Sequence, residues 1–288
     1  MNRTLQFFIL LLLFSSCRDT RDKTIEHSVT DDLGNVFLFS EIPVRVISLA
    51  PSITECIFYI NAENNLKGIT DYCDYPQGVE KKVRVGGMID PNTELIARLN
   101  PDLIFITTEG NSQLTYKNLK ELGYRVFVFN PKTVNDIYRM LEKLNEIFRP
   151  EKGSETLRRF SDSLAFKKSR DRTFAGFISV KPLITFNSNT FINDIFSGCG
   201  FINVYGSEKL DYPSVSDEDL NIKNPDYLMI MINSSPGLKE KLNEEIIKRF
   251  GSLKSVRDNK IIYLDESIFS RPGPRVIRAM QFLNEQGD

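Results

Sequence analysis

The fold is decided by two matching stretches, ELIARLNPDLIFI at residues 94–106 and EDLNIKNPDYLMI at residues 218–230. A glutamate, an Asn-Pro-Asp triplet and a final isoleucine coincide in the two stretches without a gap. We expect a helix to end before each proline, because proline cannot continue a helix and biases the residue before it to extended geometry. The apolar run after each triplet predicts a core strand. The repeat therefore indicates a duplicated α/β lobe.

Glu94 and Glu218 begin the two copies of the repeat. A carboxylate in the first turn of a helix is favoured by the helix dipole, by about 0.3–1 kcal/mol, and this alone can account for both residues. The dipole does not require matched positions in two lobes, however. Matched positions follow if two equivalent surfaces meet one symmetrical partner, so both interpretations stay open at this point.

The composition narrows the classes of protein. The chain has 288 residues, of which 41% are hydrophobic and 26% charged, and its net charge of −1 gives no reason to expect a nucleic-acid partner. The only histidine, His27, lies near the N-terminus, so catalysis that needs an imidazole base and histidine-rich metal sites are both disfavoured. We predict that the protein is not an enzyme and has no metal site. The alternative is a hydrolase that uses Asp71 and Asp74 as acid and base.

The first seventeen residues, MNRTLQFFILLLLFSSC, combine a positive charge with an apolar run that is too short to span a membrane. This pattern is typical of a secretory signal peptide. Small residues directly before Cys17 resemble a bacterial lipoprotein signal, which implies cleavage before this cysteine and acylation of its thiol. An ordinary signal peptide with a chance cysteine is the alternative. We expect residues 18–30 to form a polar tether, with the mature protein outside the cytoplasm and anchored to a membrane by lipid.

The other cysteines have no spacing typical of metal ligands. One disulfide is possible among Cys56, Cys73 and Cys199, but we expect Cys56 and Cys199 to be small buried apolar residues.

Strands that alternate with helical segments predict a parallel α/β architecture. The expected strands lie at 44–50, 66–70, 102–108, 125–130, 174–180, 226–232 and 260–264. Between the fourth and fifth of them, residues 157, 160 and 164 are apolar at helical spacing. We therefore predict an N-terminal lobe at residues 31–149, a connecting helix at residues 150–171 and a C-terminal lobe at residues 172–288.

Six motifs in order resemble a family of extracytoplasmic substrate-binding proteins that serve ABC importers of cobalamin and ferric siderophores. They are RVISLAPSITE (45–55), DYCDYP (71–76), GGMIDPNTELIARLNPDLI (86–104), NDIFSGCGFINVY (193–205), DYPSVSDEDLNIKNPDYLMI (211–230) and SRPGPRVIRAM (270–280). The resemblance implies a monomer with two Rossmann-like α/β lobes, a single long helix between them and a ligand cleft at their junction. It also implies that Glu94 and Glu218 dock into arginines of a dimeric permease.

The DYCDYP stretch looks most like the cobalamin-binding branch of this family. The resemblance places Tyr72 where an aromatic residue packs on the corrin ring, and Tyr212 at another such position; ordinary packing is the alternative for each. A flat, largely neutral macrocycle suits aromatic contacts.

Loops after strands supply further candidates for ligand binding, because ligands of α/β proteins bind outside the carboxyl ends of parallel strands. These candidates are Thr107, Thr108, Phe269 and Arg271. An anionic siderophore would need several cationic side chains, of which only Arg271 is a candidate, since we expect Arg275 to be structural. Haem would need a tyrosine as axial ligand. A corrinoid is therefore the expected ligand, with a ferric siderophore or haem as the alternatives.

Overall fold

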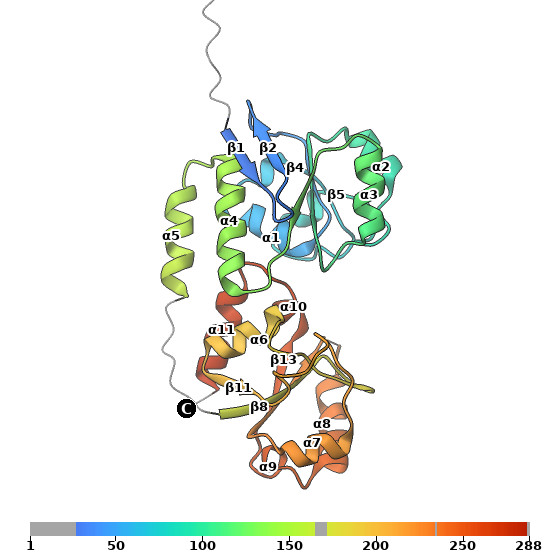
Figure 1. The fold of residues 1–288 in the computed structure, drawn as a ribbon, viewed down its shortest axis with the longest axis vertical. Coiled ribbons are helices and arrows are strands. Elements are labelled where there is room, and N and C mark those ends of the chain that lie inside the picture. Colours follow the sequence, from blue (N-terminus) through green and yellow to red (C-terminus); the bar gives the residue numbers. More distant parts are fainter. Residues whose placement is uncertain (1–26, 165–171, 234, 287–288) are drawn as a thin grey trace, which may run out of the picture.

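The protein has two α/β lobes stacked along its longest axis (Figure 1). The structure, a computed structural model, describes residues 27–164, 172–233 and 235–286. No helix within these ranges is long and apolar enough to cross a membrane. Cys17 and the expected signal peptide lie outside the described residues.

The N-terminal lobe is built on a five-stranded parallel sheet of order β5-β4-β3-β6-β7. The strands are β3 (Val46–Ser48), β4 (Leu66–Ile69), β5 (Val83–Arg84), β6 (Leu103–Thr107) and β7 (Val126–Phe129). The helices are α1 (Pro51–Tyr59), α2 (Thr93–Leu99), α3 (Gln113–Glu121) and α4 (Val134–Phe148), with short 3-10 helices at Glu63–Asn65 and Val79–Lys81. Side chains of α1 and α4 share one core cluster and those of α2 and α3 another.

The C-terminal lobe has a four-stranded parallel sheet of order β11-β8-β12-β13. Its strands are β8 (Arg172–Phe177), β11 (Phe201–Asn203), β12 (Tyr227–Ile232) and β13 (Ile261–Asp265), and β9 (Ser179–Val180) pairs with β10 (Leu183–Ile184) in a small antiparallel ribbon. Its helices are α6 (Phe191–Gly198), α7 (Asp217–Lys223), α8 (Leu238–Phe250), α9 (Lys254–Arg257), α10 (Glu266–Phe269) and α11 (Val276–Glu285). All seven strands expected from the sequence are therefore confirmed.

The two copies of the sequence repeat adopt the same local structure. Helices α2 and α7 both end at an asparagine in the left-handed conformation, with φ of 44° at Asn100 and 40° at Asn224. Asparagine tolerates this conformation better than most residues with a side chain. Proline then prevents the helix from continuing, and the chain enters β6 in one lobe and β12 in the other. The Asn-Pro-Asp triplet thus ends one helix and leads the chain into the next strand.

The aspartate of each triplet fixes the neighbouring strand. Asp102 Oδ2 accepts hydrogen bonds from the backbone N–H groups of residues 44 and 45, directly before β3, at 3.0 and 2.9 Å. Asp226 Oδ2 accepts from the N–H and the hydroxyl of Thr173 in β8, at 3.0 and 2.9 Å. Burial alone would raise the pKa of Asp226, but the hydrogen bonds from Lys254 and Thr173 outweigh it and lower the pKa to about 2. Each carboxylate therefore links two neighbouring parallel strands near their N-terminal ends, β6 with β3 in one lobe and β12 with β8 in the other.

The predicted connecting helix is described only in part. Helix α5 (Gly153–Ser163) packs on α4, with the ring of Phe160 6.4 Å from that of Tyr138 and 5.9 Å from that of Tyr59. Residues 165–171 lie outside the described residues, so a single helix that joins the lobes stays a prediction. Helix α4 also contributes to the junction, because Asp194 in α6 accepts a hydrogen bond from the N–H of Val134 at 2.7 Å.

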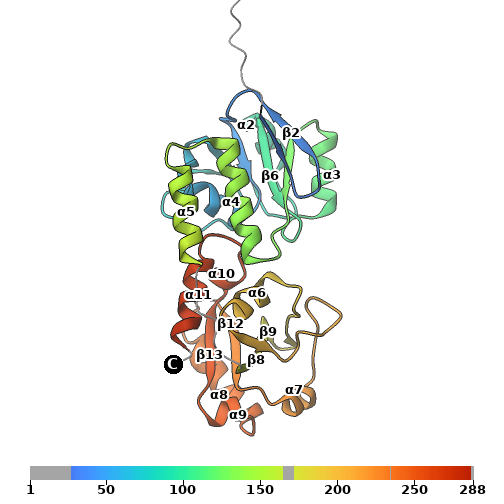
Figure 2. The same ribbon diagram turned by 60° about the vertical axis from the view of Figure 1, so that its left-hand side comes forward.

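Figures 1 and 2 show the α10–α11 segment of the C-terminal lobe directly below α4 and α5. One continuous cluster of buried side chains extends from the N-terminal lobe, with Phe105 and Phe148, into the C-terminal lobe, with Phe174 and Phe196. The lobes therefore share a hydrophobic core at their junction and are not independent domains joined only by a linker.

The predicted polar tether at residues 18–30 was too long. Residues His27–Thr30 form strand β1, which pairs antiparallel with β2 (Val36–Phe39). The His27 ring stacks on Phe39 at 5.4 Å, and its Nε2 lies 2.9 Å from the carbonyl oxygen of Glu146 in α4. Alternate residues of the hairpin, Val29, Phe37 and Phe39, are buried, which is the reason that this segment is part of the lobe.

Cys56, Cys73 and Cys199 are buried, which confirms the expectation for Cys56 and Cys199. Burial raises the pKa of the Cys56 thiol well above its ordinary value. These cysteines therefore behave as small apolar core residues.

Candidate ligand-binding cleft

A pocket of about 610 Å³ lies between the two lobes. The N-terminal lobe lines it with Pro51, Ser52, Tyr72, Met88, Thr107, Glu109, Gly110, Pro131 and Lys132, and the C-terminal lobe with Asp211, Tyr212, Glu266, Ser270, Arg271 and Pro272. Most of these residues follow the carboxyl ends of strands, where ligands of parallel α/β proteins bind. The volume falls within the roughly 300–1,000 Å³ that is usual for a ligand pocket.

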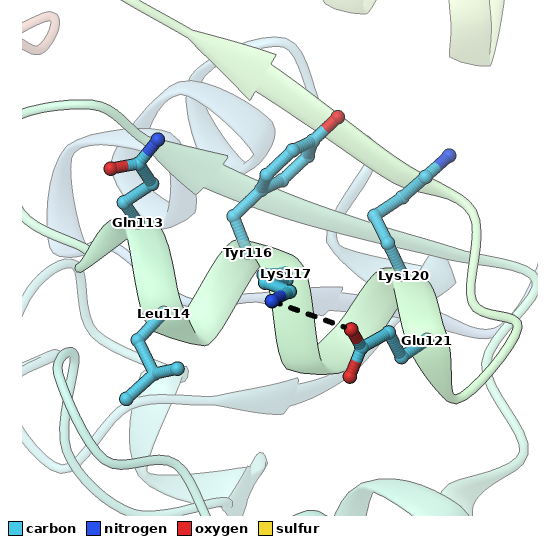
Figure 3. A pocket seen from close by; sticks show the side chains of 6 residues that line it. All are labelled: Gln113, Leu114, Tyr116, Lys117, Lys120 and Glu121. Carbon is cyan, nitrogen blue, oxygen red and sulfur yellow. Dashed lines mark ion pairs between the residues drawn. The ribbon is translucent and has the colours of Figure 1, made fainter.

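A second hollow, of about 650 Å³, lies along the surface of α3 (Figure 3). All of its lining residues come from this one helix, including Leu114, with 65% of its surface exposed, and the Lys117–Glu121 pair at 3.8 Å. The interlobe cleft differs because it brings together side chains from both halves of the chain. We therefore take the cleft as the candidate site.

The two predicted aromatic contacts lie in the same cleft, one from each lobe. Tyr72 is 60% exposed and Tyr212 is 42% exposed, so both rings have free surface for a ligand. Burial, followed by the charges of Glu109 and Asp211, raises the pKa of Tyr212 to about 12. Its hydroxyl therefore stays protonated and uncharged in the physiological range.

Of the two predicted threonines, Thr107 lines the cleft and Thr108 does not. Thr107 ends β6 and lines the cleft, where its Oγ1 accepts a hydrogen bond from the N–H of Gly110 at 3.1 Å. Asn111 Oδ1 accepts from the N–H of Thr107 at 2.9 Å, so this loop is held firmly. The hydroxyl of Thr108 donates to the side chain of Asn130 instead, and Thr108 does not belong to the cleft lining.

Phe269 is likewise not brought to the cleft surface, contrary to the prediction that it contacts the ligand. It is only 2% exposed, and its ring stacks on Phe196 at 5.9 Å and meets Phe282 edge-on at 6.2 Å. The short helix α10 directs this side chain toward α6 and α11 in the core, whereas Glu266 at the start of the same helix lines the cleft.

Arg271 lines the cleft, but its guanidinium is already engaged by the opposite lobe. It forms an ion pair with Asp74, donates to the carbonyl oxygen of Tyr72 at 3.4 Å and lies 3.5 Å from Glu55 Oε1. The Arg271 hydrogen bond lowers the pKa of Asp74. The alternative role of Asp74 as a general acid loses support, because a carboxyl group with a lowered pKa is a poor general acid near neutral pH.

Behind Arg271, a buried ion pair joins the lobes. Arg275 donates from Nε to Glu55 Oε2 at 2.9 Å and from Nη2 to Glu55 Oε1 at 2.7 Å, with Glu55 2% and Arg275 9% exposed. Arg275 also donates to the Ser267 carbonyl oxygen at 2.8 Å and lies over the Tyr75 ring at 4.6 Å. Burial raises the pKa of Glu55, although both arginines oppose this effect. Arg275 is therefore structural, as predicted.

Sequence reasoning missed several cleft residues, of which Glu109, Lys132, Asp211 and Glu266 are charged. Glu109 and Lys132 follow β6 and β7 and form an ion pair at 2.6 Å. The position directly after a predicted strand was the available signal for both of them and for Glu266. Within the described residues, no group of three or more His, Cys, Asp or Glu side chains could hold a metal ion.

Glu94 and Glu218 both occupy the second position of their helices, α2 and α7, and both are exposed. Figure 1 shows α2 at the right of the N-terminal lobe and α7 at the bottom of the C-terminal lobe. The repeat thus places two equivalent carboxylates on the surface, one per lobe.

Comparison with known proteins identifies the family. Residues 46–268 match the family model described as periplasmic binding protein. The chain belongs to this family. A vitamin B12-binding protein of Photorhabdus laumondii is 31% identical over 252 residues, which cover 85% of this chain and 88% of that protein. The predicted resemblance is therefore confirmed, and with it the role of a substrate-binding protein.

Two solved structures support the two-lobed α/β fold. The periplasmic vitamin B12-binding protein of Vibrio cholerae is 26% identical, with a TM-score of 0.75 over 85% of this chain and 96% of that chain. A possible iron-binding periplasmic solute-binding protein of Staphylococcus epidermidis is 25% identical, with a TM-score of 0.73 over 85% of this chain and 99% of that chain.

Replacing Glu55 by alanine is expected to lower the free energy of unfolding by about 3–5 kcal/mol, because Arg275 is left buried without a counter-charge. Asp74→Ala is the matched control. It also removes a carboxylate that pairs with an arginine across the lobes, but its side chain is 63% exposed, and we expect a loss of about 0–1 kcal/mol. Chemical unfolding of both variants measures the difference. Equal small losses would contradict the importance assigned to the buried pair.

Proposed function

We propose that the protein captures a corrinoid of the vitamin B12 type in the interlobe cleft and delivers it to an ABC importer outside the cytoplasm. The observation that carries this proposal is the presence of Tyr72 and Tyr212, from opposite lobes, in one cleft. Two partly exposed aromatic rings suit the face of a large planar macrocycle. The vitamin B12-binding relatives of Photorhabdus laumondii and Vibrio cholerae support the same ligand class.

The remaining lining of the cleft also suits a ligand with a broad apolar surface. Met88, Pro51, Pro131 and Pro272 supply apolar contacts from both lobes. Thr107 and Ser270 add a small number of polar groups that can orient amide substituents of a corrin.

The lobes are expected to move little when a ligand binds. Wide hinge closure would break the Glu55–Arg275 pair and the hydrophobic cluster that extends through both lobes. Breaking a buried ion pair leaves uncompensated charges and costs several kcal/mol. A preformed cleft with small adjustments is therefore the favoured mode of capture.

Delivery is proposed to use Glu94 and Glu218 as docking residues for a dimeric permease. The matched positions of the two carboxylates in α2 and α7 suit a partner that presents two equivalent cationic surfaces. Such complementary charges accelerate encounter and fix orientation more than they add affinity. A lipid anchor at Cys17, which lies outside the described residues, would hold the receptor close to the membrane that contains the permease.

Tyr72→Ala is expected to weaken the binding of cyanocobalamin roughly tenfold, because the corrin ring loses an aromatic contact. Tyr72→Phe keeps the ring and should bind with nearly unchanged affinity. Calorimetric titration of the two variants and the wild type measures the effect. Unchanged affinity of Tyr72→Ala would show that the ring does not contact the ligand.

The double variant Glu94→Arg/Glu218→Arg is expected to bind ligand normally but to abolish uptake, since its docking charges are reversed. Uptake of labelled cyanocobalamin by cells that depend on this protein is the measurement. The control is Glu151→Arg/Glu285→Arg, which makes the same change of charge at two exposed glutamates that lie outside α2, α7 and the helix α8 that pairs with α7. Normal uptake by the Glu94→Arg/Glu218→Arg cells would refute the docking proposal.

A further inference from the structure

The basic side chains that line the interlobe cleft are paired with acids of the protein, whereas two of its acidic side chains form no ion pair within the described residues. Five lining side chains are charged: the acids Glu109, Asp211 and Glu266, and the bases Lys132 and Arg271. They come from both lobes, so a ligand that fills the cleft is exposed to all of them.

Both cations of the lining are already neutralised within the protein. Lys132 pairs with Glu109 at 2.6 Å. Arg271 pairs with Asp74 and also lies 3.5 Å from the buried carboxylate of Glu55. A negatively charged ligand would have to compete with these carboxylates for either cation.

Two acids of the lining keep their charge uncompensated. Asp211 accepts a hydrogen bond from the amide of Asn187 at 3.2 Å, and Glu266 lies in the first turn of α10. Neither forms an ion pair with any side chain in the described part of the protein. Asp211 lies in the loop between β11 and α7 and Glu266 at the start of α10, so the C-terminal lobe contributes two uncompensated negative charges to the cleft.

The raised pKa of Tyr212 agrees with the presence of these negative charges. The carboxylates of Glu109 and Asp211 add to burial in raising its pKa to about 12, which shows that the surroundings of this hydroxyl resist a negative charge. An anionic group of a ligand placed beside the ring would meet the same resistance.

We propose that the cleft selects its ligand by charge, with Asp211 and Glu266 as specificity-determining residues that admit neutral or cationic metal chelates and exclude polyanionic ones. The inference rests on the proposed function and deepens it, because it separates the expected corrinoid from the alternatives. Cyanocobalamin is electrically neutral overall, whereas a ferric tris-catecholate is a polyanion and haem carries two propionates. A polyanion would lose its hydration in the cleft without gaining a free cation.

The test is a calorimetric titration of the detergent-solubilised mature protein with four probes. They are cyanocobalamin as a neutral chelate, an ammonium-bearing ferric trihydroxamate as a cation, and a ferric tris-catecholate and haemin as anions. The variant Asp211→Asn/Glu266→Gln removes both charges and preserves the shapes of the side chains. The variant Glu151→Gln/Glu244→Gln removes two exposed charges elsewhere and serves as control.

We expect the wild type to bind cyanocobalamin and to reject the tris-catecholate. In Asp211→Asn/Glu266→Gln the affinity for the tris-catecholate should rise roughly tenfold or more relative to the affinity for cyanocobalamin, because repulsion from two nearby charges is removed. Higher salt should weaken the discrimination of the wild type by screening. The control variant should behave as the wild type.

The outcomes separate this inference from the proposed function. If the wild type binds the tris-catecholate as tightly as cyanocobalamin, or if Asp211→Asn/Glu266→Gln changes no affinity for an anion, charge selection is overturned while a corrinoid function stands. If the wild type binds the cationic trihydroxamate but no corrinoid, and still rejects both anions, charge selection is supported while the corrinoid function fails.

Discussion

The ion pair between Glu55 and Arg275 is the constraint on which the cleft depends. It joins α1 of one lobe to the start of α11 in the other, and both side chains are almost fully withdrawn from water. Such a pair adds little net stability, but separating its members is costly. Arg271 and Asp74 extend the link to the surface, where Arg271 also holds the backbone of Tyr72. The same network that orients the lobes thus positions an aromatic residue proposed to contact the ligand.

Duplication explains how the chain builds two lobes that face a common cleft. In each lobe an asparagine in the left-handed conformation ends a short helix, a proline redirects the chain, and an aspartate ties the new strand to its parallel neighbour. Repeating this unit places strand ends and the loops after them in comparable positions in both sheets. The cleft forms where these two sets of loops meet, and the first residues of α2 and α7 remain on the outer surface.

Local signals in the sequence predicted most of the secondary structure, because helix ends at proline and buried β-rich runs depend on neighbouring residues. The β1–β2 hairpin was missed, since each of its strands has only four residues. The packing of Phe269 in the core was missed because it depends on the direction of a four-residue helix. The contact between Glu55 and Arg275 joins residues 220 positions apart, and no local pattern predicts such a pair. The family resemblance placed Tyr72 and Tyr212 in the cleft, and the rule that ligands bind at the carboxyl ends of parallel strands placed Thr107 and Arg271 there; all four line it.

The central claim is that a corrinoid occupies the cleft between the lobes. A crystal structure of the mature protein with cyanocobalamin tests it most directly. The account predicts the corrin ring in contact with Tyr72 and Tyr212, with the Glu55–Arg275 hydrogen bonds retained. An empty cleft at saturating cyanocobalamin, or a corrinoid bound only outside the cleft, would contradict it.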